Sequence, residues 1–142
     1  MYRERFLFND KKLKVSDATT LIDSLLVTGF SYDRFDTEDN NYAEFCHLTH
    51  KTRGVRRGGA AAVDLAFVAS GKVDGYWESG LEIWDLAAGA IIVKEAGGSV
   101  SDYPNGEFNL SSGRILACCP RLEKELKLEL SKVTPLKKQL YT

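Results

Sequence analysis

Two carboxylates seven positions apart, Glu78 and Asp85, provide the clearest chemical feature of the sequence. Asp85 falls in the predicted first turn of a helix whose other residues are small or apolar. The helix dipole and the free N–H groups of that turn favour a carboxylate, so a capping role explains Asp85 on physical grounds. The same oxygen atoms suit a hard cation, because Mg²⁺ prefers carboxylate ligands and needs only one or two from the protein. Both interpretations stay open at this point.

The elements on either side of these acids place them at one edge of a sheet. Residues 73–78 predict a strand that ends at Glu78, and residues 84–96 predict a mostly apolar helix that is stopped by Gly97 and Gly98. Since α/β proteins bind ligands where strands end and helices begin, we expect Glu78 and Asp85 to face the same crevice. Trp84, beside Asp85, either shields that crevice from solvent or packs in the core.

Strands and helices alternate along the rest of the chain. Short strands are expected at 6–8 and 12–15 around a turn, then at 24–30, 99–103 and 114–118; helices are expected at 40–50, 60–70 and 122–130. One face of the helix at 40–50 carries Tyr42, Phe45, Cys46 and Thr49, and residues 53–59 read as a flexible basic segment. The helix at 60–70 is apolar almost all round, with Asp64 its only charge, so it must be covered on several sides. This order predicts an α/β fold: a layered α/β/α sandwich with a mixed sheet and buried helices.

Composition excludes several classes of protein. The chain has 142 residues, 44% of them hydrophobic and 27% charged, with a net charge of −1. These values are typical of a globular domain and argue against disorder or a nucleic-acid-binding surface. No apolar run approaches the length of a membrane span. The first eight residues are too short and too charged for a signal peptide, and the odd number of cysteines suggests no disulfide framework, so a cytoplasmic protein is expected.

Several familiar motifs are absent or incomplete. Gly71-Lys72 lacks the other residues of a phosphate-binding loop, and the glycines within 54–59 lack the spacing of a dinucleotide fingerprint. Residues 46–50 contain one Cys and two His at a chelating spacing, but no second ligand pair follows, so a partly solvated helix face is favoured over a zinc site. Cys118 and Cys119 end a predicted strand and are expected to fill the core. No Gly-x-Ser-x-Gly elbow occurs.

Longer runs of residues carry a specific resemblance. Trp-Asp-x-Ala-Ala-Gly at 84–89, Glu-Ala-Gly-Gly at 95–98, Asp-Gly-Tyr-Trp-Glu at 74–78 and the small-residue run at 56–66 resemble the inositol monophosphatase family. The resemblance extends from about Phe6 through the last helix and corresponds to the C-terminal half of a typical member. The whole chain, residues 1–142, is therefore expected to form a single domain similar to that C-terminal subdomain.

The resemblance implies Mg²⁺-dependent hydrolysis of a phosphate monoester without a covalent intermediate. By position, Asp85 matches a metal ligand close to the substrate, which makes it the candidate catalytic residue. Glu78 matches a carboxylate that binds a sugar-like hydroxyl group, and the backbone that lines the same pocket corresponds to Gly59, Ala60 and Ala61. Arg56 and Arg57 either meet phosphate or a neighbouring subunit or are solvated surface residues. The implied substrate is a small phosphorylated polyol such as an inositol phosphate, and relatives acting on histidinol phosphate, sugar bisphosphates or adenosine bisphosphate leave the choice open.

The chain also departs from the family pattern. Members carry an upstream Glu and an Asp-Pro-x-Asp-Gly-Thr motif that supply most metal ligands, and this sequence contains neither. We therefore expect a truncated gene, a mis-called start or one piece of a split protein, and little or no hydrolysis by this chain alone. The alternative is a non-catalytic remnant that binds a partner. A homodimer, or association with the missing N-terminal half, is expected; contact with nucleic acid or membrane is not.

Overall fold

The computed structural model describes residues 7–103 and 106–137. Its strands are β1 (Leu7–Phe8), β2 (Lys11–Lys12), β3 (Leu25–Thr28), β4 (Gly54–Arg57), β5 (Gly75–Glu78), β6 (Ser99–Ser101) and β7 (Ile115–Cys118). Its helices are α1 (Tyr42–Lys51), α2 (Ala61–Ala69), α3 (Ile83–Glu95) and α4 (Pro120–Ser131), with a 3₁₀ turn at Leu110–Ser112. Within these residues, no helix has the length and apolar character needed to cross a membrane.

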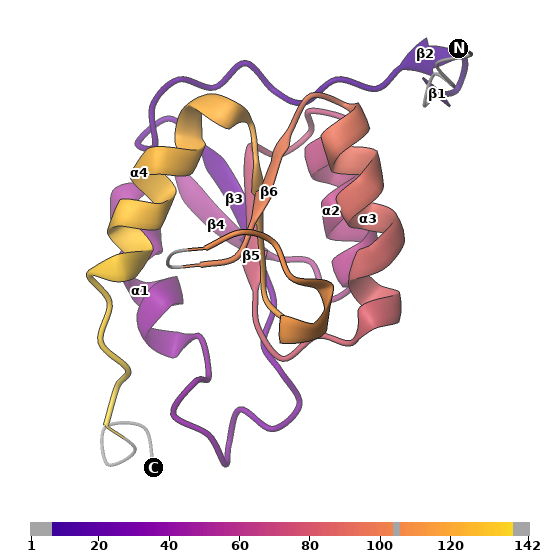
Figure 1. Ribbon diagram of the computed structural model, residues 1–142. Helices are drawn as coiled ribbons and strands as arrows, with labels where there is room; N and C mark the ends of the chain where they lie inside the picture. The colour runs from indigo at the N-terminus through magenta and orange to yellow at the C-terminus, as the bar shows by residue number, and fades with distance from the viewer. Residues whose placement is uncertain (1–6, 104–105, 138–142) are drawn as a thin grey trace.

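A mixed five-stranded sheet in the order β4-β3-β5-β7-β6 organises the described residues, while β1 and β2 form a separate antiparallel hairpin. The pairs β3–β4 and β3–β5 are parallel, and β5–β7 and β6–β7 are antiparallel. Figure 1 shows α2 and α3 on one side of this sheet and α1 and α4 on the other. The predicted α/β class, with a mixed sheet between helical layers, is thereby confirmed.

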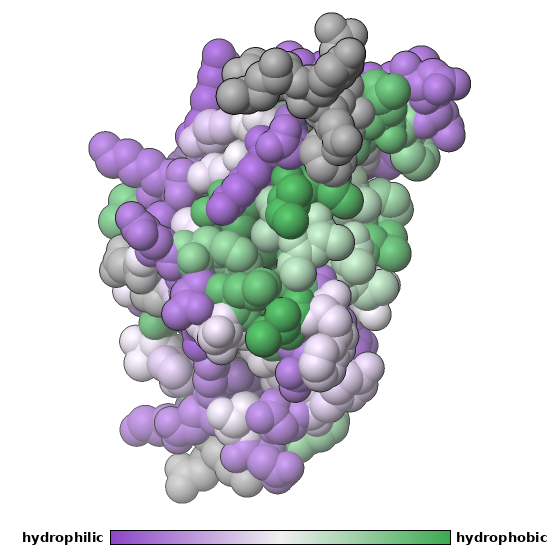
Figure 2. Space-filling model, turned by 45° about the vertical axis from the view of Figure 1, so that its right-hand side comes forward, coloured by the Kyte–Doolittle hydropathy of each residue, from purple (hydrophilic) through white to green (hydrophobic). Residues whose placement is uncertain are grey.

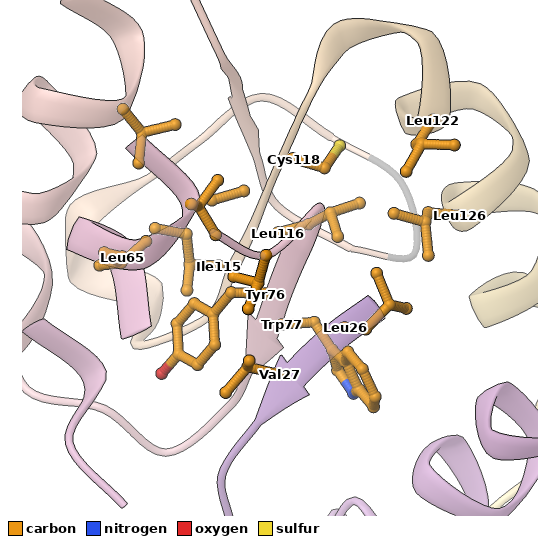
Figure 3. Close-up of a cluster of buried hydrophobic side chains, with 14 of the residues drawn as sticks. Leu26, Val27, Leu65, Tyr76, Trp77, Ile115, Leu116, Cys118, Leu122 and Leu126 are labelled. Carbon is orange, nitrogen blue, oxygen red and sulfur yellow. The ribbon is translucent and has the colours of Figure 1, made fainter. Parts of the chain in front are cut away.

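The apolar core lies on both faces of the central strands. Side chains alternate across a strand, so Tyr76 points to the layer of α2 while Trp77 points to the layer of α1 and α4. Figure 3 shows Leu65 of α2 near Tyr76, and Leu122 of α4 beyond Trp77 on the opposite side. Cys118 and Cys119 are buried, as expected of residues that fill the core.

The structure corrects two local predictions and shows which sides of α2 and α3 are covered. The segment expected to be flexible contains β4, which pairs with β3 over its whole length; Arg56 and Arg57 are exposed on this edge strand, so their charges are no obstacle to pairing. On α1 the buried residues are Ala43 and Leu48, because this helix packs against β4 and α4, whereas Cys46 is exposed. The helices α2 and α3 are covered on the side of the sheet, but part of their outer surface is exposed. Phe6 of the predicted hairpin lies outside the described residues.

Candidate functional site

Glu78 is the last residue of the central strand β5 and is only 7% exposed. Its carboxylate accepts a hydrogen bond from the Tyr76 hydroxyl and lies against the backbone of Gly29, where a Cβ would overlap it. Burial raises the pKa of Glu78 above its ordinary value; the Tyr76 bond opposes this shift, and the charges of Asp64 and Asp85 add to it. The sequence prediction that Glu78 ends a strand is confirmed.

Asp85 occupies the first turn of α3, as predicted. Its Oδ2 accepts a hydrogen bond from the backbone N–H of Glu82 at 3.1 Å, and the Glu82 side chain accepts one from the backbone of Asp85 in return. This reciprocal capping box realises the capping interpretation of Asp85. The carboxylate is partly exposed, and its charge acts on Glu78, so the two acids lie within electrostatic reach of each other. Trp84 is 77% exposed and does not pack in the core of the described chain.

The turn between β4 and α2 contains the predicted pocket backbone. Gly59 has a φ of +91°, a conformation that favours glycine, and open space surrounds its Cα. Ala60 is the N-cap of α2 and has no side chain that can accept bonds from the first turn, while Ala61 begins the helix. The small residues therefore leave the backbone of this turn accessible to a ligand.

Asp64, one helical turn further along α2, is a buried acid beside this turn that the sequence analysis did not single out as a candidate site residue. It is only 2% exposed, and its Oδ2 has no hydrogen-bond partner among the described residues. The carboxyl group lies against Gly58, where a Cβ would overlap it. Burial raises the pKa of Asp64 to about 6. The available signal was a lone charge in an apolar helix.

A second unpredicted feature, on the other face of the sheet, is a network around Asn41. Its Nδ2 donates to Thr28 Oγ1 at 2.8 Å and to the Gly29 carbonyl at 2.7 Å, and its Oδ1 accepts from Trp77 Nε1 at 2.7 Å. The Thr28 hydroxyl in turn donates to the Trp77 carbonyl at 2.5 Å. The network joins the ends of β3 and β5, which carry Gly29 and Glu78.

The two arginines before the turn lie at the surface. Arg57 stacks over the Phe30 ring, with its guanidinium carbon 5.6 Å from the ring centroid, and Arg56 bonds locally to the Val55 carbonyl. The charge of Arg57 lowers the pKa of Glu78 and so partly opposes the effect of burial. Arg57 is thus the arginine that acts on the site.

The sequence profile of the inositol monophosphatase family matches residues 3–134. The chain belongs to this family. An inositol-1-monophosphatase from Synechocystis is 55% identical over 87% of this chain and 43% of its own length. A Nus factor SuhB from Pasteurella multocida is 41% identical over 89% of this chain and 46% of its own. The solved inositol monophosphatase from Anabaena superposes with a TM-score of 0.87 at 55% identity, over 90% of this chain and 53% of that one. The chain thus spans about half the length of the relatives it matches.

Members of the inositol monophosphatase family are generally metal-dependent. Within residues 7–103 and 106–137, no group of three or more His, Cys, Asp or Glu side chains is arranged to hold a metal ion. Asp85 offers one partly exposed carboxylate, and ion affinity rises with the number and charge of the ligands. The described residues therefore do not form a metal site by themselves.

Part of the outer surface of α2 and α3 is apolar. Figure 2 shows this hydrophobic area across the side of the molecule formed by the two helices. Its exposed side chains include Val63 and Phe67 of α2 and Ile91 of α3. A pocket opens on the same side and is lined by Phe67 of α2, Ile92 of α3, Phe8 of the β1–β2 hairpin and Lys72 of the segment that follows α2. Large exposed apolar patches mark contacts with proteins, membranes or ligands.

Proposed function

We propose that this chain forms one half of a Mg²⁺-dependent phosphate monoester hydrolase of the inositol-1-monophosphatase type. The observation that supports this most is the family match over residues 3–134, together with the position of Glu78 at the end of β5 and of Asp85 in the first turn of α3. In this proposal Asp85 is a metal ligand and, through the metal, the catalytic residue of the chain. The backbone of Gly59, Ala60 and Ala61 lines the substrate pocket. The family match supports a phosphatase function.

Glu78 is suited to orient a phosphorylated polyol. A buried carboxylate forms strong hydrogen bonds with hydroxyl donors, because charge-assisted bonds are stronger away from bulk water. Tyr76 fixes one oxygen of Glu78 and leaves acceptor capacity for a ligand hydroxyl. We propose an inositol phosphate or a similar sugar phosphate as the substrate.

The remaining metal ligands would come from polypeptide outside this sequence. The chain spans about half of its relatives' length, and the apolar surface of α2 and α3 offers a place for the other half to pack. We propose this association in the cytoplasm, where the free cysteines Cys46, Cys118 and Cys119 stay reduced. A homodimer is the other arrangement that would cover the surface.

A second candidate function is a non-catalytic, partner-binding domain. It is favoured by the lack of a metal-holding cluster among the described residues and by relatives named Nus factor SuhB. Under this proposal, the apolar surface binds a protein partner and the acids at the sheet edge have no catalytic role.

The two candidates differ in a phosphate-release assay. The chain is incubated with myo-inositol 1-phosphate and excess Mg²⁺, alone and together with the part of the Synechocystis relative that it does not match. The hydrolase proposal expects release by the mixture, little by the chain alone, and loss of release in the mixture with Asp85→Asn. Asp17→Asn, at an exposed surface acid, is the matched control. Association of the two parts without any phosphate release would favour the non-catalytic domain.

A further inference from the structure

The burial of Asp64 without a donor calls for an explanation. A buried polar atom that lacks a hydrogen-bond partner destabilises the folded state, so such atoms are rare; a functional role or a bound group that completes the bonding is one explanation. Asp64 is 2% exposed, and its Oδ2 is unpartnered within the described residues. The ion pairs found among those residues do not include Asp64.

Helix capping does not account for this side chain. Asp64 is the fourth residue of α2, and its backbone N–H already donates to the Ala60 carbonyl at 2.9 Å. The carboxyl group turns back over Gly58, away from the following turns of the helix. It therefore points to the turn that precedes α2, where the backbone from Gly58 to Ala61 borders the candidate pocket.

The register of the sheet places Asp64 beside Glu78. Thr28 of β3 pairs with Arg57 of β4, so Gly29 and Gly58, the next residues, follow at the same edge of two neighbouring strands. The Glu78 carboxylate covers Gly29, and the Asp64 carboxyl covers Gly58. Neighbouring strands are about 5 Å apart, so the two acids lie side by side over adjacent glycines. The charge of Asp64 acting on Glu78 agrees with this placement.

We propose that Asp64 is a second hydroxyl-binding residue beside Glu78, so that the two carboxylates accept hydrogen bonds from two adjacent hydroxyl groups of one polyol. This inference rests on the proposed function, in which Glu78 binds the first hydroxyl. Glu78 already has a donor in Tyr76, whereas Asp64 Oδ2 has none among the described residues and requires one. A hydroxyl group supplies a donor without adding a second charge. Asp64 is then a specificity residue that distinguishes adjacent diols from single alcohols.

The test measures the binding of two simple probes to the full chain by chemical-shift titration in ¹H–¹⁵N spectra. The probes are 1,2-cyclohexanediol and cyclohexanol, which differ by the second hydroxyl group. They are titrated into the unchanged chain, Asp64→Asn, Glu78→Gln and the surface control Asp17→Asn. The ratio of the two affinities within each protein cancels general effects of a substitution, and the spectrum itself reports whether each variant is folded.

For the unchanged chain and Asp17→Asn, we expect the diol to bind about tenfold more tightly than the single alcohol, as a charge-assisted hydrogen bond predicts. In Asp64→Asn the advantage of the diol should fall several-fold, because an amide makes the weaker neutral bond. In Glu78→Gln binding of both probes should weaken. These results together would establish the second acceptor.

An unchanged diol-to-alcohol ratio in Asp64→Asn would overturn the inference, and so would a failure of the unchanged chain to bind the diol. Neither outcome decides the proposed function, which the phosphate-release assay tests separately. Conversely, a diol preference that depends on Asp64, in a chain whose mixture releases no phosphate, would support a polyol-binding site without hydrolysis.

Discussion

Replacing Asn41 with alanine should destabilise the folded chain by about 4 kcal/mol. The substitution leaves the Trp77 indole N–H and the Gly29 carbonyl without their buried partner, and each such loss costs about 1–3 kcal/mol. Asn41 also has a φ of 66°, in the left-handed region, which costs an ordinary residue about 1 kcal/mol more than it costs asparagine. Since whole domains are stable by about 5–15 kcal/mol, the variant would keep only part of its stability.

Urea unfolding followed by far-UV circular dichroism measures this loss, provided that the slope with urea stays constant. Asn41→Gly separates the two contributions, because glycine removes the side chain but accepts the backbone conformation without strain. Asn41→Gly should therefore be more stable than Asn41→Ala, although a substitution by glycine ordinarily destabilises a protein more than one by alanine. In a cycle with Trp77→Phe, the Asn41→Ala loss should shrink, because the indole donor is already gone. A loss below about 1 kcal/mol, or a glycine variant less stable than alanine, would refute this account of the network.

Three further predictions concern charge and exposed surface. The pKa of Asp64 is raised from 3.8 to about 6, so the unfolded chain releases this proton at a lower pH than the folded chain does. The free energy of unfolding should therefore fall by up to about 3 kcal/mol as the pH rises from about 4 to 6. Urea unfolding of Asp64→Asn should lack that decline. The pKa of Glu129 is lowered by its bonds to Lys132 and His47. The stability that Glu129 contributes is therefore present above its ordinary pKa and is lost as the pH falls through its lowered pKa. Glu129→Gln should lower the Tm at pH 7, and the difference in Tm from the unchanged chain should shrink in acid. Phe67→Glu should reduce self-association of the chain in light scattering across a concentration series, because it places a charge on the exposed apolar surface; unchanged association would exclude that surface as the contact.

Periodicity and glycine positions were sufficient to predict most of the fold, because the helices and central strands are locally consistent with their environment. The strand β4 was missed for a physical reason. Its residues Gly54–Arg57 show no apolar alternation, and its extended conformation comes from pairing with β3 rather than from its own side chains. The apolar character of α2 and α3 could be predicted from the sequence, but such a helix indicates only that it needs cover, not which face receives it.

The residues of the candidate site also fall into two groups: those that the sequence pattern predicts and those that only the folded structure identifies. The positions of Glu78 and Asp85 could be predicted from the sequence, because each stands at a boundary between elements; their roles stay predictions. Asp64 and Asn41 could not be singled out, because their importance depends on tertiary neighbours: Gly58 for one, Trp77 for the other. An asparagine that adopts a positive φ before a helix has only a weak sequence signal.

The two faces of β5 have complementary roles, and this links the stability of the chain to its chemistry. Successive side chains of a strand point to opposite faces, so the orientation of Trp77 on one face fixes the direction of Glu78 on the other. Trp77 is held by apolar packing and by Asn41, whereas Glu78 and Asp64 lie buried as acids, which favours unfolding. The packing and hydrogen bonds of Trp77 on one face therefore offset the destabilising acids on the other. Removing the Asn41 side chain should consequently disturb the position of Glu78, because Asn41 holds Trp77 and the Gly29 carbonyl next to this acid. The same spectra that follow diol binding should show weaker binding in Asn41→Gly than in Asp17→Asn.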